Sequence, residues 1–265
     1  MLSRRELLGT LGGLAMGGAL AATVGRASAA PFDQATAPFG WTAHKLDPAP
    51  CAQTAYNGYW HNGYGCCYGT FYAIVGTMAA QYGAPYNQFP FTMMEVGKSG
   101  ISEWGTICGA LLGVASAYAL FWGRKERNAM VTELFRWYEQ TAFPQYDPGE
   151  AAKGVKGKLP VSRSDSVLCH ISVSRWCYAS KFAEGSTQRS ERCSRVTADV
   201  AAKGIAILNA KIDGAFAPAG EPEAVAYCGQ CHSRGKEADI AKGFMNCRPC
   251  HDGSEHVQDK FKKHP

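Results

Sequence analysis

The sequence has little of the alternation between polar and apolar residues that predicts β-strands, and it has only a small excess of positive charge. The first absence argues against a sheet-based fold, so we expect a mainly α protein. The formal net charge of +5 falls to about +3 without the first 29 residues, which is too little to indicate nucleic-acid binding. After those residues no apolar stretch is long enough to span a bilayer.

The first thirty residues have the composition of a bacterial export signal. Twin arginines precede an uncharged stretch rich in Gly, Ala and Leu, which is typical of a twin-arginine (Tat) signal. The stretch Ala27–Ala29 then provides a small-residue cleavage site. A retained membrane anchor is the alternative, but the cleavage site favours removal of residues 1–29. The mature chain is therefore expected in the periplasm, without a permanent membrane anchor.

Two short cysteine motifs stand near the C-terminus. The stretches Cys228–His232 and Cys247–His251 both read C-x-x-C-H, the attachment motif for c-type haem. Two thiols on one helical turn can add to the two vinyl groups of one haem, and the adjacent histidine becomes the proximal iron ligand. The four cysteines also match a zinc-ribbon spacing, but zinc does not require a histidine after each pair. We expect two haem c groups per chain, attached through Cys228, Cys231, Cys247 and Cys250, with proximal ligands His232 and His251.

A helical domain is expected between the export signal and the haem motifs. Residues 31–65 and 144–165 read as loops, and residues 215–224 form a linker rich in Pro, Ala and Gly. The predicted helices cover 70–81, 107–121, 128–142, a segment that contains Cys169 and Cys177, and 190–212. The expected organisation is a signal over 1–29, a helical domain over 30–214, a linker over 215–224 and a small, loop-rich dihaem domain over 225–265.

Seven of the eleven cysteines lie in the predicted helical domain. Because seven cannot all pair within one chain, a second metal site deserves consideration. Cys66, Cys108 and Cys193 each fall near a predicted helix start, where backbone amides lower a thiol pKa and favour binding of iron–sulfur clusters or zinc. The alternative is a set of buried, unmodified cysteines. Cys51 and Cys67 could pair as a disulfide or stay free.

Four motifs of the chain resemble split-Soret cytochrome c. They lie at Gly65–Gly69, Gly105–Gly113, Leu168–Cys177 and Glu191–Val200, and the resemblance covers nearly the whole mature chain. The N-terminal part is also similar to a wider family of redox proteins defined by a Cys, a CGAxxG and two later cysteines. This resemblance implies a homodimer with stacked haems at one end and a [2Fe-2S] cluster held by four cysteines. The ligands it favours are Cys66, Cys108, Cys177 and Cys193, with Cys169 as a substitute.

Each haem iron also needs a sixth, distal ligand. Five histidines outside the two motifs could supply it: His44, His61, His170, His256 and His264. The candidates we favour are His256, which lies inside the haem tail, and His44. His256 is only five residues beyond His251 and cannot easily reach the opposite face of the same haem. The resemblance implies that a ligand is exchanged between the two subunits. Ligation by two histidines closes both faces of the iron and favours electron transfer over substrate chemistry.

Together these features predict a periplasmic electron carrier and not an enzyme. Single electrons would pass through stacked, bis-His-ligated haems and the cluster, to and from redox partner proteins that the sequence does not name. The alternative is a haem-dependent small-molecule reductase or peroxidase, which needs a displaceable axial ligand.

Overall fold

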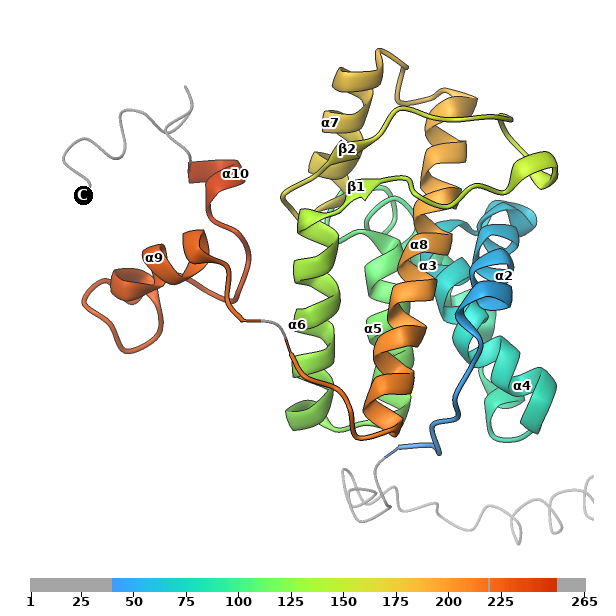
Figure 1. The fold of residues 1–265 in the computed structure, drawn as a ribbon, viewed down its shortest axis with the longest axis horizontal. Coiled ribbons are helices and arrows are strands. Elements are labelled where there is room, and N and C mark those ends of the chain that lie inside the picture. The colour runs from blue at the N-terminus through green and yellow to red at the C-terminus, as the bar shows by residue number, and fades with distance from the viewer. Residues whose placement is uncertain (1–39, 219, 252–265) are drawn as a thin grey trace, which may run out of the picture. The chain divides into compact units, whose positions relative to one another are not determined.

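The computed structural model describes residues 40–218 and 220–251, and these are mainly helical (Figure 1). The predicted export signal and the candidate ligand His256 lie outside the described residues. Within the described ranges, no helix combines the length and apolar character that crossing a bilayer requires. The linker expected over 215–224 follows one helix and overlaps the first two residues of the next, which begins at Glu223. The stretch includes one position outside the description, and its role as a domain boundary stays a prediction.

The first half of the helical region begins with α2 (Pro48–Trp60) and a short 3-10 turn, η2 (His61–Gly63). A continuous helical run follows, and Gly83 ends it with a φ of 70°. This run confirms the helix predicted over 70–81 but starts earlier, so that the cysteines before it lie inside its first turn. It comprises α3 (Gly65–Phe71), the π-helical turn η3 (Tyr72–Gly76) and α4 (Thr77–Tyr82), and two 3-10 segments come next, η4 (Tyr86–Gln88) and η5 (Phe91–Gly97).

The second half supplies four further helices. The sequence predicts the bounds of three of them within a few residues, and the fourth is the helix predicted to contain Cys169 and Cys177. They are α5 (Gly109–Phe121), α6 (Arg124–Gln140), α7 (Cys169–Ser180) and α8 (Thr187–Ile212). The expected loop over 144–165 contains only a 3-10 turn, η6 (Gly149–Ala151), and β2 (Ser162–Arg163), which pairs antiparallel with β1 (Ala142–Phe143). The haem motifs lie on and beside α9 (Glu223–His232) and α10 (Arg248–His251).

The helix α2 corrects the prediction of a loop over residues 31–65. Its apolar residues show only weak helical periodicity, which is why the pattern did not reveal it. The signal that could have found it is local: the Asp47 side chain accepts a hydrogen bond from Ala49 N at 3.0 Å, and Pro48 occupies the first helical position. An acidic N-cap followed by proline is a favourable helix start even where the apolar pattern is weak.

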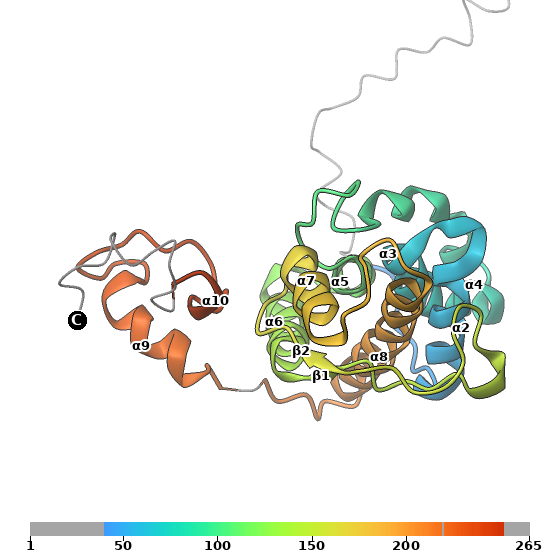
Figure 2. The same cartoon turned by 90° about the horizontal axis from the view of Figure 1, so that it is seen from above.

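The long helix α8 is the centre of the helical region. It packs against α2, α3, α5 and α6, and Figure 2 shows it between α6 on one side and α2 on the other. The face it buries includes Val196, Val200, Ile205 and Leu208, each at most 2% exposed. Ser186 caps its first turn by accepting a hydrogen bond from Arg189 N at 3.2 Å. Because α8 touches most of the other helices, residues at its N-terminal end meet residues from several distant parts of the chain.

A buried ion pair joins α8 to α2 and to the loop after β1. Glu191 is fully buried and accepts hydrogen bonds from Arg195 Nε at 2.7 Å and from the Tyr56 hydroxyl at 3.0 Å. Gly154 N donates to the same carboxylate at 2.9 Å. The two Nη atoms of Arg195 donate hydrogen bonds to backbone carbonyls of the loop, those of Gly157 and Val155. Both charges are therefore compensated inside the protein, as buried charges must be.

We expect Glu191→Gln to lower the free energy of unfolding by about 3–5 kcal/mol, because it leaves the Arg195 charge buried without its partner. Urea unfolding followed by far-ultraviolet circular dichroism measures the loss. The matched control is Glu150→Gln, which breaks the exposed pair with Lys156 and should change stability little. Equal decreases in the free energy of unfolding in the two variants would show that the buried ion pair stabilises the fold no more than the exposed pair does.

Candidate metal centre and haem-attachment motifs

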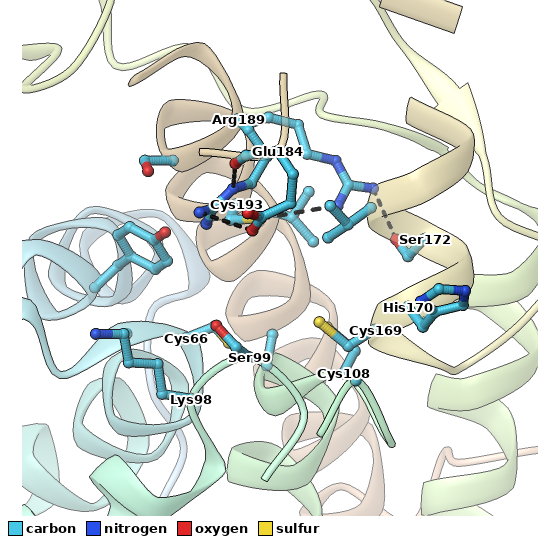
Figure 3. A pocket seen from close by; sticks show the side chains of 18 of the residues that line it. Cys66, Lys98, Ser99, Cys108, Cys169, His170, Ser172, Glu184, Arg189 and Cys193 are labelled. Carbon is cyan, nitrogen blue, oxygen red and sulfur yellow. Dashed lines mark hydrogen bonds and ion pairs between the residues drawn. The ribbon is translucent and has the colours of Figure 1, made fainter. Parts of the chain in front are cut away.

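Four cysteines from four separate elements line one cavity of about 650 Å³, here called the four-cysteine pocket (Figure 3). Cys66 lies in the first turn of α3, and Cys108 is the residue that precedes α5. Cys169 is the first residue of α7, and Cys193 lies in the second turn of α8. The structure thus brings together three of the predicted ligands and the predicted substitute.

A short backbone pairing explains why Cys108 and Cys169 are neighbours. The segments that lead into α5 and α7 form an antiparallel bridge between Ile107 and Leu168. Cys108 N donates to Val167 O at 2.8 Å, and Cys169 N donates to Thr106 O at 2.6 Å. The two helices therefore start side by side, and each presents a cysteine at its start.

Small residues in α5 bring Cys66 to the same place. A Cβ atom at Gly109 would lie 2.6 Å from Cys66 Sγ, and one at Gly113 would overlap Thr70 Oγ1 and the Cys67 carbonyl. At these glycines other backbone comes close to α5: that of α3 at both positions, and that of Gly97 at Gly109. The packing of α3 on α5 carries Cys66 to Cys108.

Burial controls the acidity of the pocket thiols. It raises the pKa of Cys66 well above its usual value, raises that of Cys108, and raises that of Cys169 to about 12. The expectation that helix-end amides would lower the pKa of Cys66 is therefore wrong, because loss of hydration disfavours the thiolate more than the amides favour it. Without metal these thiols are protonated at neutral pH, and metal binding would release their protons.

The remaining cysteines of the helical region lie elsewhere. Cys177 is on α7, two turns beyond Cys169, and does not line the pocket. Burial, and after it the neighbouring Cys193, raise the pKa of the Cys177 thiol. Cys51 and Cys67 are buried in the apolar core, with Cys51 Sγ 3.9 Å from Thr77 Oγ1. All eleven cysteines are free in the structure, so Cys51 and Cys67 form no disulfide.

The four pocket cysteines do not converge on one point. Among the described residues, no three His, Cys, Asp or Glu side chains have the geometry that would hold a single metal ion. The pocket therefore offers soft sulfur donors around a cavity, without the closed tetrahedral arrangement that one structural zinc ion requires.

An unusual backbone turn forms part of the pocket rim. Ser99, Ile101, Ser102 and Glu103 all have positive φ values, between 49° and 69°, which is a strained conformation for residues with a side chain. Hydrogen bonds hold the turn, including Ser102 N to Val96 O at 2.8 Å and Gly105 N to Ser99 O at 3.0 Å. The rim is thus kept in a fixed shape despite its backbone strain.

The first haem motif lies at the end of α9. Cys228 and Cys231 are three residues apart on one turn, as attachment to a single haem requires. His232 Nδ1 is 3.2 Å from Ala238 O. If Nδ1 carries the proton, it donates to this carbonyl and Nε2 is the nitrogen that can bind iron, an orientation common for metal-binding histidines.

The second haem motif is close to the first. Cys247 precedes α10, which contains Cys250 and ends at His251. Burial and the neighbouring Cys228 thiol raise the pKa of Cys247. The two attachment motifs thus meet through Cys228 and Cys247. Of the candidate distal ligands, only His44 is described, and its ring stacks on Tyr82 with ring centres 3.8 Å apart.

Comparison with known proteins assigns the family. Residues 67–207 match the sequence family described as "Putative redox-active protein (C_GCAxxG_C_C)". The chain is 56% identical over 277 aligned positions to the split-Soret cytochrome c of Desulfovibrio desulfuricans, with 100% of this chain and 99% of the relative covered. The chain belongs to the split-Soret cytochrome c family. Membership implies haem and supports a cytochrome c role in electron transfer.

A solved structure of the split-Soret cytochrome c from Desulfovibrio desulfuricans, described as having a novel iron centre, matches this fold with a TM-score of 0.82. It is 58% identical in sequence, and the match covers 88% of this chain and 99% of that one. In the wider redox family the motif reads GCAxxG, whereas here Cys108 precedes Gly109 to give CGAxxG. The family match begins at Cys67, yet its neighbour Cys66 is the residue that lines the pocket.

Sequence reasoning missed the polar groups around the pocket of this split-Soret family member. Arg192 and Ser172 line the pocket, as does Tyr138 from α6. Arg192 directly precedes Cys193, which is a usable signal because a cation beside a thiol favours the thiolate. No comparable signal exists for Tyr138 or Ser172, since both reach the pocket only through helix packing.

We expect Gly113→Ala to destabilise the protein by about 1–3 kcal/mol, because the added methyl group forces α3 away from α5. Labelling of Cys66 by a thiol reagent under native conditions should also become faster, as measured by mass spectrometry. Gly185→Ala is the control, since its added methyl group meets nothing within 4 Å. Unchanged labelling in Gly113→Ala would contradict the role assigned to this glycine.

Proposed function

We propose that this chain is an electron carrier that holds two covalently attached haems and an iron centre in the four-cysteine pocket. The observation that carries the proposal is the pocket itself, where four thiols that are up to 127 residues apart in the sequence share one cavity. The same chain also contains two C-x-x-C-H motifs. Membership of the split-Soret cytochrome c family supports both parts.

The residues present fit two haem c groups. Each motif places two thiols on one turn and a histidine directly after them. In this proposal Cys228 and Cys231 hold one haem and Cys247 and Cys250 the other, and each haem supplies a one-electron couple. Contact between the two motifs through Cys228 and Cys247 favours haems that lie close together, as stacking requires.

The residues also fit a [2Fe-2S] cluster. A cluster of this type takes four cysteine ligands and divides them between two irons, so the sulfurs need not meet at one point. This agrees with four thiols that surround a cavity without single-ion geometry. We revise the ligand set proposed from the sequence and replace Cys177 by Cys169. The proposed ligands are Cys66, Cys108, Cys169 and Cys193.

We further propose a homodimer in which His256 or His44 supplies the distal haem ligands, with one ligand exchanged between subunits. The Tat pattern supports export to the periplasm, where haem attachment would follow. Electrons would pass to and from redox partner proteins, and the haems would break no substrate bond. These statements rest on the sequence motifs and on the family resemblance.

The decisive measurement is the cofactor content of anaerobically purified protein. We expect four irons per chain, of which two are haem iron by the pyridine haemochrome assay, and about two acid-labile sulfides. Two irons in total, all of them in haem, would remove the iron centre from the proposal. A colourless protein that contains zinc would contradict it entirely.

The revised ligand set is tested by two cysteine variants on the same helix. Cys169→Ser should remove most of the acid-labile sulfide, because it deletes a pocket thiol, whereas Cys177→Ser should retain it. Haem content should stay at two per chain in both and serves as the internal control. Loss of sulfide in Cys177→Ser with retention in Cys169→Ser would restore the ligand set that the sequence favoured.

A further inference from the structure

One charged group in the four-cysteine pocket lacks the partner that a buried charge needs. The residue Arg192 is only 2% exposed. Among the residues that the structure describes, its Nε atom has no hydrogen-bond partner, and its guanidinium forms no ion pair with a carboxylate. This contrasts with Arg195, one turn further along α8, whose charge is matched by Glu191 at 2.7 Å. Burial of a cation without a compensating charge is strongly unfavourable. An anion bound in the pocket would stabilise the Arg192 guanidinium.

A hydrogen-bond chain fixes the guanidinium between two of the pocket cysteines. Arg192 Nη2 donates to Ser172 Oγ at 2.8 Å, and Tyr138 Oη is also 2.8 Å from Ser172 Oγ. At one end of the chain Arg192 Nη1 is 4.0 Å from Cys193 Sγ. At the other end the Tyr138 hydroxyl is hydrogen-bonded to Cys108. The guanidinium is thus held at the pocket wall and cannot turn away to solvent.

The other charges around the pocket balance one another. Arg189 also lies near Cys193, but its Nη2 pairs with Glu184 at 3.0 Å, and its side chain is 18% exposed. Lys98 and Glu103 add one positive and one negative charge to the lining.

The partly buried Asp199, also on α8, interacts electrostatically with Arg192 but forms no ion pair with it. Its carboxylate accepts hydrogen bonds from Gln145 N at 2.9 Å and Tyr146 N at 2.7 Å. Arg192 is therefore the buried cation of the pocket that has no carboxylate within ion-pair distance among the described residues.

We infer that Arg192 is the charge-compensating residue of the iron centre and raises its reduction potential. The inference rests on the proposed function, because it requires thiolate-ligated iron in the pocket. Such a centre carries net negative charge, and its sulfurs accept hydrogen bonds, which the unpaired Nε–H and the Nη1–H of Arg192 can supply.

The sign of the effect follows from charge alone. Reduction adds one electron, delivered by a redox partner or by a haem, while Arg192 keeps its proton and no covalent bond forms or breaks. A fixed positive charge in a buried site stabilises the reduced, more negative form more than the oxidised form. Removal of that charge should therefore make the centre harder to reduce.

The test is Arg192→Gln in the full-length holoprotein, with Arg189→Gln as the matched control on the same helix. Iron and acid-labile sulfide are measured first, and the potential is then obtained by redox titration monitored by electron paramagnetic resonance. At the wild-type midpoint, the ratio of reduced to oxidised centre should fall by about tenfold or more in Arg192→Gln, which corresponds to about 59 mV for one electron. In Arg189→Gln the ratio should change less than about threefold, although Arg189 also lies near Cys193, because its charge is already paired with Glu184 and solvent screens this partly exposed pair.

A fully loaded Arg192→Gln protein with the wild-type potential would overturn the inference, as would equal shifts in the two arginine variants. A wild-type protein without non-haem iron would instead contradict the proposed function. If Arg192→Gln cannot be loaded with iron, the inference is tested by comparing the reduction potentials of Ser172→Asp and Ser172→Asn. The aspartate would neutralise the guanidinium and lower the potential relative to the asparagine, and equal potentials in that pair would overturn the inference.

Discussion

The close approach of α3 to α5 is the constraint on which the four-cysteine pocket depends. Gly109 and Gly113 leave no side chain between the two helices, so the backbone of α3 fills the space. Only this contact puts Cys66 beside Cys108, because the two residues are on different helices and belong to no common turn. The backbone bridge at Ile107 then adds the start of α7 to the same place. A Cβ atom at Gly109 would lie 2.6 Å from Cys66 Sγ, so this position in particular requires glycine.

The N-terminal end of α8 shows how the protein distributes buried charge. Glu191, Arg192 and Arg195 are all at most 2% exposed, yet only two of them form a pair. Spacing on the helix explains the difference: Glu191 and Arg195 are four residues apart and share one face, whereas Arg192 points toward a different neighbour. The Glu191 pair secures the fold, and the unmatched guanidinium faces the pocket, where an iron centre would supply the compensating charge.

Much of the fold could be predicted because the helices are long and their apolar faces are regular. The sequence predicts the bounds of α5, α6 and α8 within a few residues, and it predicts a helix containing Cys169 and Cys177 where α7 lies. The helix α2 was missed because its packing against α8, and not its own periodicity, stabilises it. The sequence predicts a lowered pKa for Cys66, whereas burial raises it. Position at a helix start can be read from the local sequence, but burial depends on the packing of distant segments.

The sequence by itself predicts the haem-attachment sites, because thioether formation and proximal ligation need five consecutive residues and nothing from elsewhere in the chain. It also determined the family, through motifs that can be read without a fold. The tertiary structure decided which cysteines share a cavity. Cys169 and Cys177 lie on the same helix, and sequence spacing does not separate them as candidates. The pairing of the segments before α5 and α7 places Cys169 in the cavity with the others. The tertiary structure also decided that Arg192 lies in the pocket without a carboxylate partner, because such a buried charge can be recognised only when its neighbours in space are known.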